Sequence, residues 1–318
     1  MKEPRRSYLT GTIRLSENPD GTAPEQYTIK SVIGEGGSSV CYEAVRTRRG
    51  GRQETGKLKE FYPVDGVGQA LHRLPSGLLV PGPGVLSRFE GMCQEYLETC
   101  NLLRQAMVAD ERNEVLKNYI QTYQELYSRP AETELAGETE AAPEMLRRAT
   151  VYVWTPGFQG KGFDVYLKEV RRDPARCPEQ KLETILQVVS ALNNCVKALH
   201  IAGLLHQDIK PSNFLLMYDS DFKVRPDSIS VFDINTLRAV DSTLPMTAGT
   251  PGFCAPEVKY GRSDNRSDLY SIGAVLFNAI VIHDAVPDGL YRDELYPNLK
   301  QLLAESRLFK ESVVNSDA

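Results

Sequence analysis

The sequence lacks the features that would place this chain in a membrane or outside the cell. Its longest apolar run, IGAVLFNAIVI, is too short to span a bilayer and contains Asn278, so it is typical of a buried helix. The first residues, MKEPRRSYLT, have no apolar core of a signal peptide. The 6 cysteines form no C-x-x-C pair and have no histidine at zinc-binding spacing. We therefore expect a cytoplasmic protein with reduced thiols and no membrane segment in this chain.

The chain also lacks an excess of positive charge. Its formal net charge is −5, which argues against binding to nucleic acid or to anionic membranes. The hydrophobic fraction of 41% and the charged fraction of 25% are ordinary for a globular protein, and 318 residues suffice for two domains. Composition thus indicates a globular protein, and only the sequence motifs can indicate its function.

The order of the predicted elements indicates two unequal parts. Residues 1–25 are a polar lead-in, and alternation of apolar and polar residues from Tyr27 predicts a hairpin and a third strand. A helical pattern covers residues 88–127, and strand-like composition returns in ATVYVWTPGF. The segment PEQKLETILQVVSALNNCVKALHIAG then has the periodicity, the initial proline and the final glycine of an amphipathic helix. We expect a small sheet-rich lobe joined near residues 155–162 to a larger helical lobe, with a ligand-binding cleft between them.

Two segments interrupt this organisation. Residues 64–87 are rich in glycine and proline, which predicts a loop or an irregular insertion. Residues 108–147 include the acidic stretch RPAETELAGETEAAPE, which predicts a surface excursion with few buried residues. A partner could dock on either insertion, and a surface feature without a readable role is the simpler interpretation.

The clearest chemistry lies in the polar loop LLHQDIKPSNFLL. It carries a carboxylate, an ammonium group and an amide in close succession, at Asp208, Lys210 and Asn213. A base for a hydroxyl proton, a cation for a phosphoryl group and a metal ligand are the parts that phosphoryl transfer needs. A solvent-exposed loop with an Asx turn is the alternative. A further carboxylate, Asp233, ends the apolar run SISVF, where metal ligands and ordinary turns are both common.

Several blocks together resemble the eukaryotic-type serine/threonine protein kinase family over about residues 27–280. HQDIKPSN is similar to the catalytic loop H-R-D-x-K-P-x-x-N, with the lysine of the serine/threonine branch. AGTPGFCAPE is similar to the block that ends the activation segment, and RSDLYSIGAVLF to the helix that follows it. The stretch LKEFYP resembles bacterial members.

The resemblance implies an α+β, two-lobed protein-kinase fold. A small β-rich N-lobe covers residues 26–154, and a larger helical C-lobe covers residues 155–318 and ends early, as if truncated at the C-terminus. The implied activity is transfer of the γ-phosphoryl group of ATP to a serine or threonine of a protein substrate. The implied cofactors are ATP and Mg²⁺.

By the same resemblance, four side chains carry the chemistry of the C-lobe. Asp208 is the catalytic base and Lys210 faces the phosphate, while Asn213 and Asp233 hold magnesium. Thr250, from AGTPGFCAPE, is expected beside Asp208 and Lys210.

In the N-lobe, GEGGSSVCYEA resembles the glycine-rich loop whose backbone N–H groups hold the phosphates of ATP. Gly34 and Gly36 match its first two glycines, Ser39 replaces the third, and Cys41 stands at the usual valine. Thr155 is expected near the gatekeeper position of the hinge. The full expected nucleotide-binding set is Gly34, Glu35, Gly36, Gly37, Ser38, Ser39, Cys41, Lys59, Thr155 and Phe158.

Lys59 matches the lysine of V-A-I-K, which holds the α- and β-phosphates. Lys57 stands where the family prefers a small alanine next to the adenine ring, and it is also the alternative to Lys59. The lysine needs a glutamate from the next helix. Glu98 is favoured because a leucine follows it one turn later, Glu95 is second, and Glu90 is the third candidate.

The chain departs from the family at the residue before Asp208. Gln207 replaces an arginine that binds a phosphate on the activation loop, so we expect activity that does not depend on phosphorylation there. The hydroxyl groups available in that segment belong to Ser242, Thr243 and Thr247. Asp268 is expected to hold the backbone of the catalytic loop, and the late arginine that pairs with Glu257 has no matching position.

Two alternatives remain open from the sequence. A pseudokinase, acting as a nucleotide-binding scaffold or regulator, is favoured by Lys57, by the residues after Asp233 and by the short end. Those residues, Ile234 and Asn235, replace the phenylalanine and glycine of D-F-G, although asparagine tolerates a left-handed backbone. A small-molecule phosphotransferase is the other alternative, and AGTPGFCAPE argues against it because those enzymes lack such a block.

Overall fold

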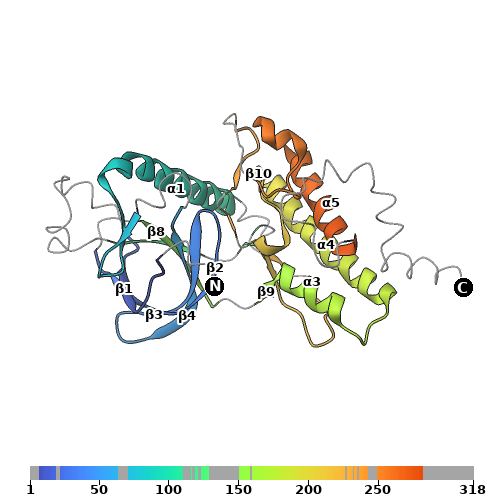
Figure 1. Cartoon of the computed structure of the whole chain (residues 1–318), viewed down its shortest axis with the longest axis horizontal. Coiled ribbons are helices and arrows are strands. Elements are labelled where there is room, and N and C mark those ends of the chain that lie inside the picture. The colour runs from blue at the N-terminus through green and yellow to red at the C-terminus, as the bar shows by residue number, and fades with distance from the viewer. Residues whose placement is uncertain are drawn as a thin grey trace, which may run out of the picture. The chain divides into compact units, whose positions relative to one another are not determined.

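The structure is a computed structural model that divides into two compact units (Figure 1). One unit comprises Met1–Glu98 with Thr122–Phe158, and the other comprises Thr99–Gln121 with Gln159–Ala318. The described residues are 7–18, 22–63, 71–109, 116, 119–120, 123–128, 150–157, 160–225, 228–231, 233–234, 236–242 and 249–281.

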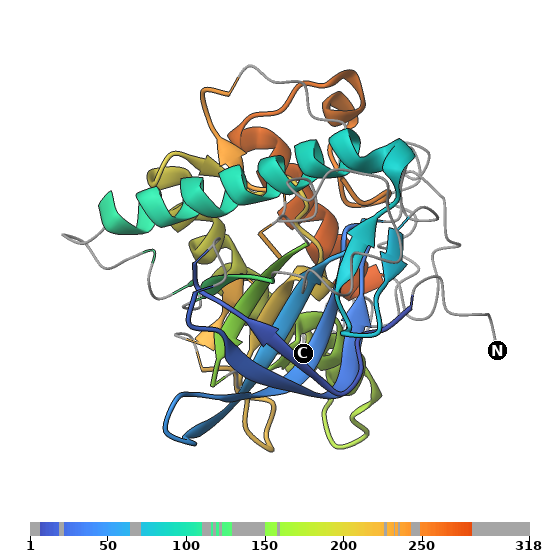
Figure 2. The same ribbon diagram turned by 90° about the vertical axis from the view of Figure 1, so that its left-hand side faces the viewer.

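The first unit is built on a six-stranded antiparallel sheet in the order β1-β2-β3-β4-β8-β7. The sheet is strongly curled (Figure 2), and its two edges meet because the N–H and C=O of Ser16 and Tyr127 exchange hydrogen bonds of 2.8 Å. This pairing satisfies edge groups that would otherwise be exposed. The strands are β1 (Thr12–Leu15), β2 (Glu25–Glu35), β3 (Ser39–Thr47), β4 (Gln53–Phe61), β7 (Gln124–Tyr127) and β8 (Val151–Pro156).

Aromatic residues fill the inside of this curled sheet. Trp154 of β8 meets Tyr27 of β2 edge to face at 5.3 Å, and both side chains are fully buried. Gly56 lies across from this indole, and a Cβ there would come within 2.6 Å of the Trp154 ring. The strand therefore needs a glycine at this position to accommodate the indole.

The segment predicted as a loop or irregular insertion folds as a hairpin over its described part. Strands β5 (Leu71–Arg73) and β6 (Leu79–Pro81) pair antiparallel, so that prediction was wrong for Leu71–Pro81. Two interactions account for the order: the hairpin buries Leu74, Leu78 and Leu79, and Arg73 binds the buried Glu60 of β4. The leucines were visible in the sequence, but neither their burial nor the pairing of Arg73 with Glu60 was.

The helix predicted over residues 88–127 is shorter than expected. A 3-10 turn, η2 (Pro83–Val85), leads into α1 (Leu86–Ala109), and Gln124–Tyr127 is the edge strand β7 instead. Leu126 explains this difference, because the strand places its side chain in the core with no exposed surface. The rest of the acidic insertion, residues 129–147, lies outside the described residues.

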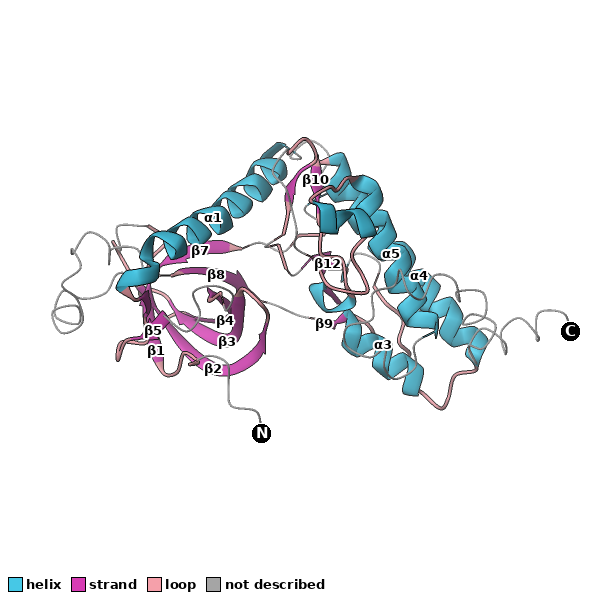
Figure 3. Cartoon of the chain, turned by 45° about the horizontal axis from the view of Figure 1, so that its top comes forward, coloured by secondary structure: helices cyan, strands magenta, loops and turns pink. Residues whose placement is uncertain are grey.

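The second unit is mainly helical in its described part (Figure 3). Its helices are α3 (Phe163–Arg172), α4 (Pro178–Ile201) and α5 (Asn265–Val281), with 3-10 turns η6 (Pro211–Asn213) and η8 (Pro256–Tyr260). The predicted amphipathic helix is confirmed as α4, which begins at a proline and is followed by Gly203 at φ 76°. None of the helices in the ranges described above is long and apolar enough to cross a membrane.

Short paired strands flank the loops of this unit. One sheet has the order β12-β11-β9, and a second pairs β10 with β13. The polar loop of the sequence runs from the end of β10 to the start of β11. The strands are β9 (Lys161–Gly162), β10 (Leu204–Leu205), β11 (Phe214–Leu216), β12 (Ser230–Val231) and β13 (Arg238–Ala239).

Candidate active site

The backbone of the polar loop is held by Asp268, in the first turn of α5. Its carboxylate, 1% exposed, accepts 2.8 Å hydrogen bonds from the N–H groups of His206 and Gln207. The ring of His200 lies 2.9 Å from the same carboxylate. The prediction that Asp268 holds this loop is confirmed, and charge-assisted bonds of this kind are among the strongest that a buried carboxylate makes.

Two buried side chains shape the turn that follows. His206 stacks on Phe214 with ring centres 5.2 Å apart, and burial lowers the pKa of His206 although Asp268, Asp208 and Asp233 raise it. Gln207 has φ 71°, in the left-handed region, and is held there by the bond to Asp268. The buried amide of Gln207 has no hydrogen-bond partner among the described residues.

Asp208 lies at the centre of a compact polar cluster. Its Oδ2 accepts hydrogen bonds from Lys210 Nζ at 2.7 Å and from Asn213 Nδ2 at 2.9 Å. Its Oδ1 accepts from the hydroxyl group of Thr250 at 2.6 Å and from the N–H of Thr250 at 3.0 Å. Lys210 Nζ also donates to the Thr250 hydroxyl at 2.7 Å. The structure thus brings together three residues predicted as site residues and the threonine expected beside them.

The cluster combines charge with partial access to solvent. The side chains of Asp208 and Lys210 are 13% and 25% exposed, so a ligand can reach them while most of the surrounding water is excluded. The carboxylate of Asp208 forms an ion pair with the ammonium group of Lys210, which is a compact positive charge. Such an arrangement can accept a proton and stabilise a phosphoryl group.

The residues predicted to hold magnesium are Asn213 and Asp233. Asn213 directs its amide nitrogen to the carbonyl oxygen of Asp208 at 2.8 Å and to its carboxylate, which leaves Oδ1 as the atom suited to a metal. Asp233, which follows β12, is half-buried, and its charge raises the pKa of His206 in the polar loop. One amide oxygen and one carboxylate fit a magnesium ion that takes its other ligands from phosphate and water. No group of three or more His, Cys, Asp or Glu side chains suited to a metal occurs among the described residues.

In the first unit, the predicted glycine-rich segment is the turn between β2 and β3. Gly36 N–H donates to the carbonyl oxygen of Ser39 at 2.9 Å, and residues 34–37 are exposed. Apart from the adjacent residues, no atom of the described part of the chain lies within 4 Å of the positions that a Cβ would take on Gly34, Gly36 or Gly37. A ligand can therefore approach this backbone closely.

Lys59 lies on β4 directly opposite Cys41 of β3 and Val153 of β8. Two residues further along β4, Phe61 stacks on Tyr96 of α1 at 4.9 Å. Residues two apart on a strand share a face, so Lys59 is on the face of the sheet that α1 covers. The lysine is largely buried there.

The glutamate that would pair with Lys59 stays a prediction. Both Glu95 and Glu98 are exposed, and Glu98 accepts a 3.2 Å hydrogen bond from Gln94 one turn earlier. At 100° per residue, Glu98 lies about 160° around the helix from Tyr96, whereas Glu95 lies about 100° away. Since Tyr96 marks the side of α1 that meets the sheet, Glu95 is the better placed of the two favoured candidates.

The hinge residues are described only in part. Thr155 of β8 lies opposite Lys57 of β4, and Gly157 donates a 3.1 Å hydrogen bond to the carbonyl oxygen of Thr55. Phe158, predicted to contact the nucleotide, lies outside the described residues, as do Asn235, Thr243 and Thr247.

Glu257 has a hydrogen-bond partner that the sequence did not predict. In the family, a late arginine was expected to pair with this carboxylate; here the hydroxyl group of Ser267, 2% exposed, donates to it at 2.7 Å. Ser267 stands in the motif RSDLYS directly before Asp268. This position next to Asp268 is the one feature of the sequence that could have indicated a structural role for Ser267.

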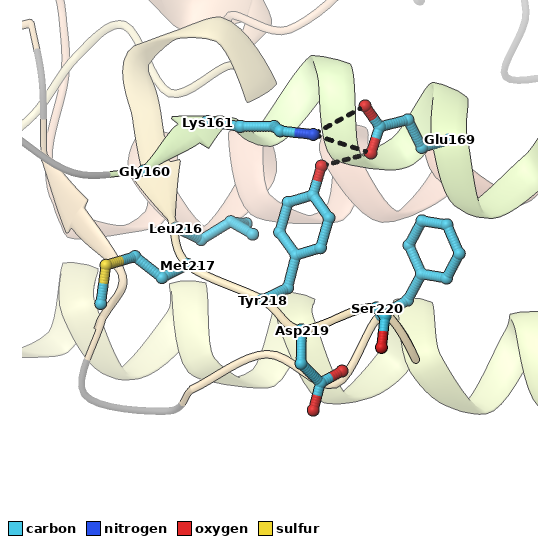
Figure 4. Close-up of a pocket in the computed structure, with 9 residues that line it drawn as sticks. Gly160, Lys161, Glu169, Leu216, Met217, Tyr218, Asp219 and Ser220 are labelled. Carbon is cyan, nitrogen blue, oxygen red and sulfur yellow. Dashed lines mark hydrogen bonds and ion pairs between the residues drawn. The ribbon is translucent and has the colours of Figure 1, made fainter.

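A pocket of about 530 Å³ in the second unit lies among β9, α3 and the turn after β11 (Figure 4). Lys161 and Glu169 form an ion pair of 3.1 Å, and the hydroxyl group of Tyr218 donates to the same carboxylate. None of the residues predicted from the sequence lines this pocket. The carboxylate of Glu169 is therefore engaged by an ammonium group and a hydroxyl group, while Asp219 in the lining accepts backbone N–H groups of its own turn.

Comparison with known proteins supports one assignment. The family model described as "Protein kinase domain" matches residues 150–313, which is more than half of the chain. PknL, a serine/threonine-protein kinase of Mycobacterium tuberculosis, is 30% identical over 159 residues, covering 46% of this chain and 37% of that protein. CBL-interacting protein kinase 28 of Oryza sativa subsp. japonica is 32% identical over 139 residues, covering 42% and 30%.

A third relative is Pkn1, a serine/threonine-protein kinase of Myxococcus xanthus. It is 29% identical over 102 residues, which cover 30% of this chain and 14% of that protein. The chain thus spans between about a seventh and two fifths of the length of these three relatives.

Proposed function

This chain belongs to the protein kinase domain family, and we propose that it transfers the γ-phosphoryl group of ATP to a serine or threonine hydroxyl group of a protein. The observation that carries the proposal is the cluster of Asp208, Lys210 and Thr250, in which base, cation and hydroxyl group lie within 2.7 Å of one another. It supports phosphoryl transfer because that reaction needs positioning and charge neutralisation more than covalent chemistry.

Asp208 is the proposed base. Both of its carboxylate oxygens already accept two hydrogen bonds, so its position and orientation are set before a substrate arrives. A substrate hydroxyl group that approaches Oδ1 competes with the hydroxyl group of Thr250, which can rotate while its backbone N–H keeps the carboxylate in place. Lys210 remains paired to Oδ2 and presents its charge to the transferring group.

Asn213 and Asp233 are the proposed ligands of a magnesium ion, which when bound neutralises charge on the phosphates of ATP. Asn213 fits this role because its amide nitrogen holds the backbone of Asp208. The same side chain therefore links the metal position to the base position. Loss of this amide should affect both.

The first unit supplies the proposed nucleotide-binding groups. The exposed backbone of Gly34–Gly37 suits the phosphates, and Lys59 suits the α- and β-phosphates. The purine base then lies further along β4, toward Thr155 and the segment that follows. The predicted cytoplasmic location and a protein substrate belong to the same proposal.

The test is phosphoryl transfer from ATP labelled at the γ-phosphate, with and without a generic protein substrate. We expect transfer by the wild-type chain and a loss of at least a hundredfold with Asp208→Asn or with Asp233→Asn. Asp221→Asn is the matched control, because Asp221 is an exposed carboxylate in the turn after β11. Its activity should equal that of the wild type.

A second readout separates catalysis from binding. Stabilisation by ATP with magnesium, measured as a shift in melting temperature, should persist in Asp208→Asn and fall in Asp233→Asn. Nucleotide binding without any transfer by the wild-type chain would overturn the proposal in favour of a pseudokinase.

A further inference from the structure

Lys57 is a charged residue on the face of the sheet that carries Lys59. The strand register places Cys41, Lys59 and Val153 in one row across β3, β4 and β8. It places Glu43, Lys57 and Thr155 in the next row. Directly opposed residues of antiparallel strands share a face, and rows two residues apart are separated by about 7 Å.

These rows run away from the end of the sheet that α1 covers. Phe61, one row before Lys59, contacts Tyr96 and Phe89 of α1. Lys57 lies on the other side of Lys59, toward Thr155 and Gly157. A nucleotide with its phosphates at the glycine turn and at Lys59 therefore has its base near the row of Lys57.

The surroundings of Lys57 are partly dehydrated. The side chain is neither fully exposed nor fully buried, and burial lowers its pKa to about 8, partly opposed by neighbouring Cys41. Around pH 7 the amine is mostly protonated, and it offers up to three donors and no acceptor. In a partly dehydrated position, such a donor favours any group that can accept a hydrogen bond.

Resting on the proposed function, we propose that Lys57 shifts the nucleotide preference of this site toward purines with an oxygen at position 6, such as GTP. A guanine presents two adjacent acceptors, O6 and N7, and lysine donates well to both. An adenine presents N7 beside a 6-amino group, which is itself a donor and faces the ammonium group unfavourably. The residue thus acts as a specificity-determining residue for the nucleotide.

The test compares dissociation constants of GTP, ITP and ATP, each with magnesium, for the wild-type chain and for Lys57→Met. Methionine keeps the length of the apolar stem and removes the donors. We expect the ratio of GTP affinity to ATP affinity to fall about tenfold in Lys57→Met. ITP, which has the 6-oxygen but not the 2-amino group, should follow GTP. Lys30→Met, on an exposed position of β2, is the matched control and should leave the ratio unchanged.

Three outcomes would overturn the inference: an unchanged ratio in Lys57→Met, an equal loss of GTP and ATP that makes Lys57 a phosphate ligand, or no binding of any nucleotide. Arg at the same position gives a further check, because Lys57→Arg keeps the donors and should keep the preference for GTP over ATP. The readout is independent of catalysis. A changed affinity ratio without phosphoryl transfer from any nucleotide would support the role of Lys57 in nucleotide preference and refute the proposed activity. Phosphoryl transfer with an unchanged affinity ratio would support the proposed activity and refute the role of Lys57.

Discussion

Replacement of Arg73 by methionine should destabilise the first unit strongly, because Arg73 neutralises a carboxylate that has no contact with water. Glu60 is fully buried, and its two oxygens accept hydrogen bonds from Arg73 at 2.9 and 2.8 Å. The hydroxyl groups of Tyr42 and Tyr152 donate to the same carboxylate at 2.8 and 3.0 Å. Arg73 also donates to the backbone carbonyl oxygens of Ser7 and Gly77. Together with its bonds to Glu60, these contacts connect the hairpin to β4 and to the N-terminal segment.

The magnitude follows from the charge that remains. Removal of one partner of a buried ion pair costs about 3–5 kcal/mol, since the other charge stays buried without compensation. Two tyrosine hydroxyl groups remain on Glu60, so we expect the lower half of that range for Arg73→Met. The double variant Glu60→Gln with Arg73→Met removes both charges and keeps an acceptor for the tyrosines. It should recover at least half of the loss.

Urea unfolding followed by tryptophan fluorescence measures this effect. The chain has 1 tryptophan, Trp154, and it lies inside the sheet of the first unit, so the signal reports on that unit. Arg48→Met is the control, because the Arg48–Glu54 pair is partly exposed at 3.5 Å and should contribute under about 1 kcal/mol. A loss below about 1 kcal/mol for Arg73→Met, or a double variant no more stable than the single one, would refute the reasoning.

Three other predictions concern the candidate site. Thr250→Ala should lower kcat about tenfold to a hundredfold, because it removes the hydroxyl group between Lys210 and Asp208. Thr250→Ser keeps that hydroxyl group, so its kcat should stay within a few-fold of the wild type. Steady-state kinetics measure both values. Lys57→Met should raise the melting temperature at pH 7. Burial lowers the pKa of Lys57 from its ordinary 10.5 to about 8 in the folded protein, so the stability of the wild type rises with pH between these two values. The advantage of the variant should therefore shrink by pH 9.5, and equal gains at both pH values would contradict this. The triple variant with alanine at Ser242, Thr243 and Thr247 should keep phosphoryl transfer activity, because Gln207 has no charge with which to bind a phosphate on that segment. Loss of transfer in this variant would refute independence from phosphorylation there.

The chemistry of the second unit was predictable because short-range sequence encodes it. Asp208, Lys210 and Asn213 lie within six residues of one another, so one loop and one 3-10 turn bring them together. Helix α4 was predictable for the same reason, since its apolar periodicity, its initial proline and its final glycine are all local signals. Asp268 was predicted only through the resemblance of its motif to a family.

Other features depend on residues far apart in the chain. Nothing near Arg73 indicates that its partner is Glu60 on a strand of another sheet. Nothing near Gln124–Tyr127 indicates that this segment closes the sheet by pairing with Ser16, at the end of β1.

The sequence by itself determined the family, the amphipathic helix α4 and the residues of the polar loop, because each is a pattern over a few neighbouring positions. Only the tertiary structure decided that Lys57 lies directly opposite Thr155 of β8, that α1 meets the sheet through Tyr96, and that the hairpin of β5 and β6 is anchored on a buried carboxylate. Strand register, helix rotation and burial are set by packing between distant segments.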